Sequence, residues 1–172
     1  LVLSIGALIP RKRHRMVIEA MARLPGVQLW IAGDGPDRVA LTGLIAALGL
    51  ESRVKLLGPT PHDEMGGLLA AADVMALASE SEGLANAWVE ALASGTPVVI
   101  TDAGGARELI DRPAAGRIVA PTPDAVAAAI ADLLADPPPR DAVAETVARY
   151  SWEANAAALH EHLSALVAAA RR

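Results

Sequence analysis

The sequence predicts an α/β fold built on a doubly wound, parallel, six-stranded sheet. Six short apolar runs bounded by turn residues recur along residues 1–120. They are apolar throughout rather than alternating, as is typical of strands covered by helices on both faces. Stretches with helical periodicity separate these runs, so consecutive strands are joined by right-handed βαβ crossovers. After residue 120 the patterns are helical only. We therefore expect a Rossmann-like sheet with a C-terminal helical extension.

The elements follow in order along the chain. Strands are expected at 1–6, 27–33, 54–58, 73–78, 97–101 and 116–120. Helices are expected at 13–24, 37–48, 62–72, 86–94 and 105–110, and then at 123–135, 139–149 and 152–170. We interpret 1–172 as a single domain, with an α/β core at 1–120 and a helical extension at 121–172. Because the chain opens directly into a strand without an initiator Met, we expect it to be part of a longer protein, with a further domain upstream.

Composition disfavours several classes of protein. The formal net charge is −5, whereas a nucleic-acid binder usually presents a basic face. Aromatic residues make up 2% of the chain, which leaves few stacking platforms for a surface carbohydrate-binding module. There is no cysteine for disulfides or thiolate metal sites. The Ala-rich run at 113–131 is interrupted by Arg117 and Asp124, and we expect no membrane span and a cytoplasmic location.

Ligands of open parallel sheets bind outside the carboxyl ends of the strands, which directs attention to five loops. The first loop carries four cations, Arg11, Lys12, Arg13 and Arg15, at the start of a helix. They fit either a solvated basic turn or a clamp for an anion such as phosphate.

The next two loops offer weaker signals. Gly33 and Gly35 form a GxG turn, but Arg38 stands where a dinucleotide fingerprint has its third glycine. We interpret Gly33 as part of a turn with a potential ligand contact. In the GPTPH loop at 58–62, two prolines hold an extended backbone that could bind a flat base edge, or they simply end the strand.

The fourth loop, SESEGLAN at 79–86, leads into a helix and carries two carboxylates, Glu82 and Glu90. The first-turn amides of that helix can receive an anion, and the two carboxylates could accept hydrogen bonds from the hydroxyls of one elongated ligand. The alternative is a turn cap at Glu82 and a surface position for Glu90. In the fifth loop, Gly104 and Gly105 allow either close approach of a ligand or a tight turn.

Together these residues resemble the C-terminal, donor-binding domain of a retaining GT-B glycosyltransferase of glycosyltransferase family 4 (group 1). The similarity covers essentially the whole chain. The matching segments are SIGALIPRK (4–12), LWIAGDGP (29–36), RVKLLGPTPHDEM (53–65), AADVMALASESEGLANAWVEALASGTPVVITDAGG (71–105) and GRIVAP (116–121). The E-x7-E element from Glu82 to Glu90 is the most specific of them.

The resemblance implies a role for each part of the site. Lys12 would bind the diphosphate of a nucleotide-sugar donor, and Glu90 would accept hydrogen bonds from the ribose. The remaining donor-binding residues would be Leu57, Gly58 and Pro59 around the base, and Glu82 with the amides of Gly83, Leu84, Ala85 and Asn86 around the sugar and phosphate. Lys12 and Glu82 would be the catalytic residues, and Arg11, Arg13, Gly33, Gly104 and Gly105 are further candidates. The partners of Glu82 would be ligand hydroxyls rather than protein cations.

The implied reaction transfers a hexosyl group from a UDP-, GDP- or ADP-sugar to an unknown acceptor, with no metal and no cofactor. The acceptor domain, and any peripheral membrane contact, would lie in the upstream part. The fragment alone would bind its donor weakly and transfer nothing. No nucleic-acid partner is expected.

Two departures from the family pattern keep other interpretations open. The usual Arg of the first loop is replaced by Ala7, and the usual Gly after the lysine is Arg13. EGLAN also stands where EGFG is common. Ala7 favours a non-catalytic or degenerate nucleotide-binding scaffold as the alternative function. A nucleotide-sugar epimerase shares the architecture. A phosphorylase would need a lysine in the late loops, but the chain has only Lys12 and Lys55.

Overall fold

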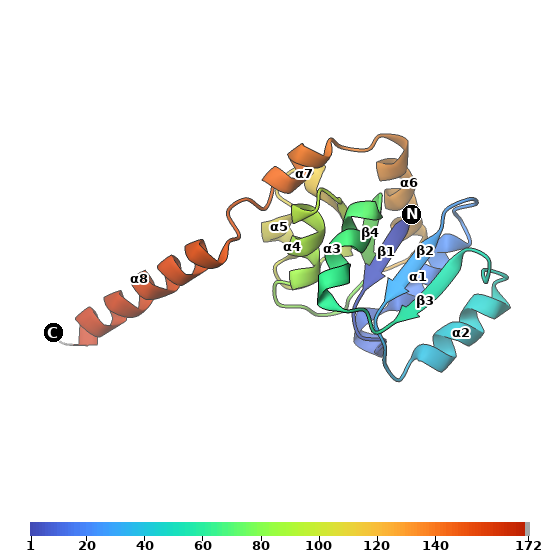
Figure 1. Ribbon diagram of the computed structural model, residues 1–172, viewed down its shortest axis with the longest axis horizontal. Coiled ribbons are helices and arrows are strands. Elements are labelled where there is room, and N and C mark those ends of the chain that lie inside the picture. The colour runs from blue at the N-terminus through green and yellow to red at the C-terminus, as the bar shows by residue number, and fades with distance from the viewer. Residues whose placement is uncertain (171–172) are drawn as a thin grey trace.

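The computed structural model describes residues 1–170. The six expected strands are present, and all except β3 are slightly shorter than their apolar runs: β1 (Val2–Ile5), β2 (Leu29–Ala32), β3 (Val54–Gly58), β4 (Val74–Leu77), β5 (Val98–Thr101) and β6 (Gly116–Val119). All pairings between neighbouring strands are parallel, in the order β3-β2-β1-β4-β5-β6 (Figure 1). The predicted Rossmann-like, doubly wound sheet is confirmed.

This strand order places a topological switch point between β1 and β4. From β1 the chain proceeds outward to β2 and β3, and it then returns to the other side of β1 to build β4, β5 and β6. The crossovers after β1 and β4 therefore lead away from each other, and the loops at the carboxyl ends of these two strands are where open α/β sheets bind ligands.

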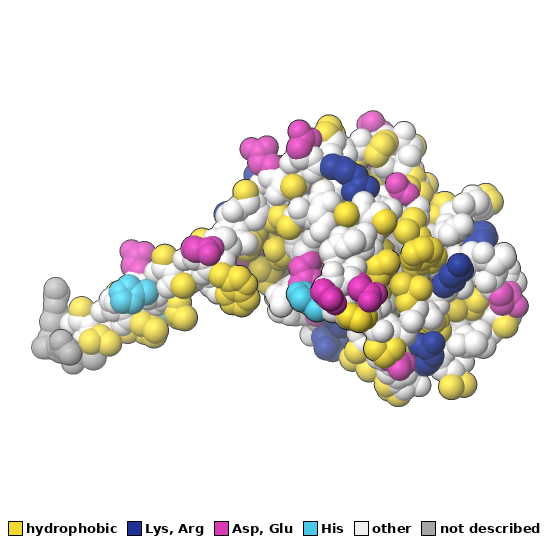
Figure 2. Space-filling model, in the orientation of Figure 1, with side chains coloured by type: hydrophobic (Ala, Val, Ile, Leu, Met, Phe, Trp, Pro, Cys, Tyr) yellow, Lys and Arg dark blue, Asp and Glu magenta, His cyan; other side chains and the backbone are white. Residues whose placement is uncertain are grey.

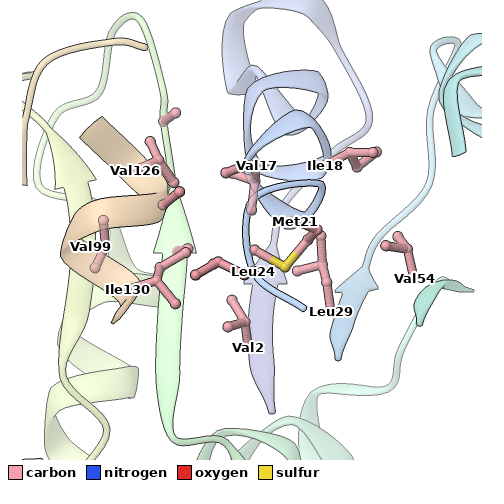
Figure 3. Close-up of a cluster of buried hydrophobic side chains, with 14 of the residues drawn as sticks. Val2, Val17, Ile18, Met21, Leu24, Leu29, Val54, Val99, Val126 and Ile130 are labelled. Carbon is pink, nitrogen blue, oxygen red and sulfur yellow. The ribbon is translucent and has the colours of Figure 1, made fainter. Parts of the chain in front are cut away.

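The strands are apolar throughout because their alternate residues enter two separate cores. Val2 and Val99 belong to one hydrophobic cluster, whereas Leu3, Met75 and Ile100 belong to the other. Figure 3 shows the first cluster, in which Val17, Ile18 and Met21 of α1 meet side chains of the sheet and of α6. Helices therefore cover most of both faces of the sheet, whereas Lys55 and Leu57 of the outer strand β3 stay exposed.

The helices are divided between the two faces. The first cluster is covered by α1 (His14–Met21), α2 (Arg38–Ala47) and α6 (Pro123–Ala135). The second is covered by α3 (His62–Ala71), α4 (Asn86–Ala93), α5 (Ala106–Leu109) and α7 (Arg140–Glu145). Two short 3-10 helices, at Pro10–Lys12 and Pro113–Ala115, complete the connections.

The segment after residue 120 does not behave as one extension. Val126, Ile130 and Leu133 of α6 are buried in the first cluster, and Val143 of α7 is buried in the second. The expected helix at 139–149 ends at Glu145, because the next amides, at Thr146, Val147 and Ala148, bond to carbonyls three residues back rather than four.

Only α8 (Trp152–Ala170) projects away from the sheet, as Figure 1 shows. Its large apolar side chains are solvent-exposed, including Trp152 at 84% and Leu159 at 55% of their full area, and Figure 2 shows yellow side chains along this arm. No helix among residues 1–170 combines the length and apolar composition that crossing a membrane requires.

Candidate functional site

The candidate site lies at the switch point, where the loops after β1 and β4 come together. Lys12 ends the 3-10 helix Pro10–Lys12 that follows β1, and Glu82 lies in the loop between β4 and α4. The amide of Glu80 donates to the carbonyl oxygen of Arg11 at 2.8 Å, so the two loops are also joined through their backbones. Residues 70 positions apart are thereby brought into contact.

Glu82 is held by two cations. Lys12 Nζ donates to Glu82 Oε1 at 2.6 Å, and Arg11 Nη1 lies 3.7 Å from Glu82 Oε2. The side chains of Glu82 and Lys12 are 8% and 16% exposed, so the ion pair is largely shielded from water. The expectation that the partners of Glu82 would not be protein cations is wrong, because the loop after β1 delivers both cations to this carboxylate.

The charges around Glu82 determine its protonation. Burial acts to raise the pKa of Glu82, but the hydrogen bond from Lys12 and the positive charges of Lys12 and Arg11 outweigh it. The pKa of Glu82 therefore lies below its ordinary value. The side chain is an anion at neutral pH.

The start of α4 presents unused backbone donors beside this ion pair. Within residues 1–170, the amides of Gly83, Leu84, Ala85 and Asn86 donate to no protein acceptor. Gly83, Leu84 and Asn86 are exposed, and the positive end of the helix dipole lies at Asn86. The amides that the sequence predicts to bind an anion are thus free to donate hydrogen bonds to a ligand.

Glu90 lies one turn further along α4. It is half-buried, and within the described part of the chain its carboxylate forms no hydrogen bond or ion pair. At 1.5 Å per residue it lies about 6 Å along the axis from Asn86. Glu82 and Glu90 therefore differ in their partners. The charge of Glu82 is balanced by protein cations, whereas the carboxylate of Glu90 is available to bind a ligand.

The glycines near the site serve the packing of its loops. A Cβ on Gly33 would lie 2.0 Å from the carbonyl oxygen of Gly6, and one on Gly104 would lie 2.1 Å from that of Glu82. The amide of Gly105 donates to the carbonyl oxygen of Gly83 at 2.9 Å. The sequence allowed two roles for Gly104 and Gly105, the close approach of a ligand or a tight turn. The structure gives the pair close contact with the Glu82 loop.

The backbone expected to hold a base lies at the end of β3. Leu57 is 38% exposed, Pro59 is exposed, and Gly58 adopts a φ of 85°. The carbonyl oxygen of Gly58 accepts from the amide of Gly33 at 2.8 Å, so it is already engaged. β3 stands two strands from β1, which is about 10 Å across the sheet. This separation suits an elongated ligand that begins at Lys12.

Arg13 has a role in the backbone that the sequence does not reveal. Its φ of 50° is left-handed, and it is the sole residue other than glycine with a positive φ among residues 1–170. This conformation explains why a glycine is usual at this position in the resembling family, since other residues pay about 1 kcal/mol or more for it. The guanidinium of Arg13 lies 3.2 Å from Glu80, away from Glu82.

His14 also lies in this region, although it was not among the residues that the sequence pointed to. His14 begins α1, is 1% exposed, and lies with Nδ1 3.1 Å from the hydroxyl oxygen of Ser4. Burial lowers the pKa of His14 to about 4. The sequence did carry a sign that His14 is buried, namely its helical spacing from apolar residues. One buried face of α1 holds His14, Val17, Ile18 and Met21.

The comparison with protein families identifies the chain. The family model described as "Glycosyl transferases group 1" matches residues 1–150, which include the whole sheet and every helix up to α7. The chain belongs to this family. The expected likeness to a group 1 GT-B glycosyltransferase is therefore confirmed.

Named relatives of this group 1 chain are glycosyltransferases. The chain is 44% identical over 104 residues to the lipopolysaccharide core biosynthesis glycosyltransferase LpsE of Rhizobium meliloti, covering 60% of this chain and 30% of LpsE. It is 36% identical over 163 residues to the GDP-mannose-dependent alpha-(1-6)-phosphatidylinositol monomannoside mannosyltransferase of Mycolicibacterium smegmatis, covering 88% and 42%. The chain therefore spans less than half the length of either relative.

Solved structures agree with the fold. Sucrose-phosphate synthase from Thermosynechococcus elongatus superposes with a TM-score of 0.89 at 31% identity, covering 98% of this chain and 45% of that one. HepE of Anabaena, solved in complex with UDP, gives a TM-score of 0.82 at 28% identity, covering 98% and 48%. HepE has also been solved with UDP-glucose.

Proposed function

We propose that this group 1 chain is the donor-binding half of a retaining, metal-independent glycosyltransferase that takes a hexosyl group from a nucleotide-diphosphate sugar. Lys12 and the free amides from Gly83 to Asn86 would hold the diphosphate. Glu90 would accept from the ribose hydroxyls, and Glu82 from the sugar. The base would lie along Leu57, Gly58 and Pro59. The UDP and UDP-glucose complexes of HepE support a nucleotide sugar as the donor.

In the proposed reaction, the bond between the anomeric carbon and the phosphate oxygen breaks, and the nucleoside diphosphate leaves with the bonding electrons. The acceptor hydroxyl oxygen forms the new bond to the anomeric carbon, and its proton passes to the departing diphosphate. Negative charge grows on the leaving diphosphate, and preorganised donors facing that charge lower the barrier. Lys12 and the amides at the start of α4 would supply them.

The observation that carries the proposal is the position of Lys12. It lies at the switch point, on the loop after β1, within 2.6 Å of a residue on the loop that leads to the unused α4 amides. A cation and a helix N-terminus that lie at the same switch point form an anion site. Arg11, which also reaches Glu82, supplies the second cation that Ala7 does not.

Calorimetric titration with UDP, GDP and ADP tests the proposal. We expect at least one of them to bind, and Lys12→Met to weaken that binding about tenfold or more, because a charge-assisted hydrogen bond to phosphate is lost. Lys55→Met is the matched control. Lys55 lies near the amino end of β3 over the ring of Trp30, so its removal should leave affinity unchanged.

The same titration decides between this proposal and a non-catalytic scaffold. Binding of none of the three nucleotides at millimolar concentration would favour the scaffold, and so would equal losses in Lys12→Met and Lys55→Met. We also expect the 172-residue chain to show no sugar transfer by itself. A clear transfer rate from the purified chain would contradict that expectation.

A further inference from the structure

Glu82 occupies the place that the proposed diphosphate needs. Both cations of the site point to its carboxylate, Lys12 at 2.6 Å from one oxygen and Arg11 at 3.7 Å from the other. An incoming anion therefore meets cations that already have a counter-charge. Because Glu82 is only 8% exposed, water screens this attraction weakly.

Contacts between backbone groups hold the loops around the ion pair without its help. The amide of Glu80 donates to the carbonyl oxygen of Arg11 at 2.8 Å. Arg11 Nη1, which lies near Glu82, also donates to the carbonyl oxygen of Ser81 at 2.6 Å. On the other side, Gly104 and Gly105 pack against the backbone of Glu82 and Gly83. The carboxylate can leave Lys12 by rotation of its side chain, while the backbone of both loops stays in place.

We propose that Glu82 is an internal competitor for the diphosphate, which the donor displaces from Lys12 and Arg11. This inference rests on the proposed function. When a nucleotide sugar binds, Lys12 exchanges the carboxylate for a phosphate oxygen, and Glu82 turns to the hydroxyls of the sugar. The lost ion pair is thus offset by new hydrogen bonds only when a sugar is attached.

This exchange gives Glu82 a part in specificity. A nucleoside diphosphate without its sugar breaks the ion pair and leaves the carboxylate beside a phosphate, with like charges in a partly buried site. The intact donor supplies hydroxyl partners instead. Glu82 therefore weakens the binding of the diphosphate product relative to the donor, and it favours product release after transfer.

The test measures the affinity of inorganic pyrophosphate, which probes the diphosphate site without assuming a base or a sugar. At fixed ionic strength, we expect Glu82→Gln to bind pyrophosphate about tenfold more tightly than the unmodified chain, because the competing charge is gone. The double variant Lys12→Met with Glu82→Gln should lose this gain. Glu80→Gln is the matched control, since it removes one charge from the same loop but from a partner of Arg13, and it should change affinity less than about twofold.

Each outcome has a definite consequence. Equal or weaker pyrophosphate binding by Glu82→Gln, in a chain whose wild type binds nucleotide, overturns this inference and leaves the proposed function standing. A gain as large in Glu80→Gln also overturns it, since the effect would then be a general one of charge. No binding of pyrophosphate, UDP, GDP or ADP by any variant overturns both. If Glu82→Gln does not fold, as thermal unfolding would show, Glu82→Asp serves in its place and should give a smaller gain in the same direction.

Discussion

His14 illustrates how one buried side chain couples the loop of Lys12 to the core. It begins α1 directly after the left-handed Arg13, and it contacts Ser4 of β1 through Nδ1. Burial lowers the pKa of His14 from 6.5 to about 4, so the ring is neutral in the folded chain at physiological pH. In the unfolded chain the ring regains its ordinary pKa and takes up a proton more readily.

The pKa difference predicts a loss of stability in acid. Between pH 6.5 and about 4 the unfolded chain binds a proton that the folded chain does not, so the free energy of unfolding falls as the pH decreases through this window. The slope from this group is at most about 1.4 kcal/mol per pH unit. Urea unfolding at pH 7.5, 5.5 and 4.5 should show a weaker dependence on pH for His14→Gln than for the unmodified chain. Equal slopes in both would contradict the role of His14.

Among the structural elements, strands and helices were the part most open to prediction. Most strands are apolar runs because helices cover both of their faces, and the strand boundaries differ from the expected ones by at most two residues. The limit of α7 was missed because its last turn is stabilised by bonds three residues apart, which leave no mark on periodicity. The parallel pairing of the strands followed from the rules for βαβ units rather than from any single residue.

The loops of the site were only partly open to prediction. The presence of Lys12, Glu82 and the α4 amides at one sheet edge follows from the strand ends on which they lie. That Lys12 pairs with Glu82 depends on how two loops approach each other across the switch point, and no local pattern records it. The need for glycine at position 104 is equally invisible in the local sequence. It arises because the carbonyl groups of a loop about twenty residues earlier in the chain leave no room for a Cβ.

Replacement of Gly104 should therefore disturb a neighbouring loop. A Cβ at this position meets the carbonyl oxygens of Glu82 at 2.1 Å and Gly83 at 2.3 Å, and φ is 53°. We expect Gly104→Ala to lower the free energy of unfolding by about 1–3 kcal/mol and to weaken nucleotide binding. Gly43→Ala, in the interior of α2 with no atom within 4 Å of the new Cβ, should be neutral or stabilising by up to about 1 kcal/mol. Chemical unfolding and calorimetry measure the two effects, and an unchanged Gly104→Ala chain would contradict the close contact.

On the scale of the whole molecule, the chain after residue 120 has two different parts. α6 and α7 complete the two hydrophobic clusters, and Arg140 at the start of α7 donates to the carbonyl oxygens of Ala70 and Ala72 at the end of α3. Every side chain described along α8 is exposed. The boundary that matters for stability thus lies near residue 151, not near residue 120.

The stabilities of truncated chains should show where this boundary lies. Removal of residues 152–172 should leave the free energy of unfolding of the remainder within about 0.5 kcal/mol, because every described side chain at 152–169 is exposed. Truncation after Asp136 should destabilise the chain strongly, since it also removes Val143, Val147 and Arg140. Denaturant midpoints followed by circular dichroism distinguish the two cases. A large drop in the midpoint from the shorter truncation would show that α8 contributes to the fold.

The outward course of α8 also determines how the molecule moves in solution. Nineteen helical residues form a rod about 28 Å long, attached to a rounded body as Figure 1 shows. Such a particle tumbles faster about the axis of its rod than end over end. Its rotational diffusion is anisotropic, and the drag it experiences exceeds that of a sphere of 17.7 kDa.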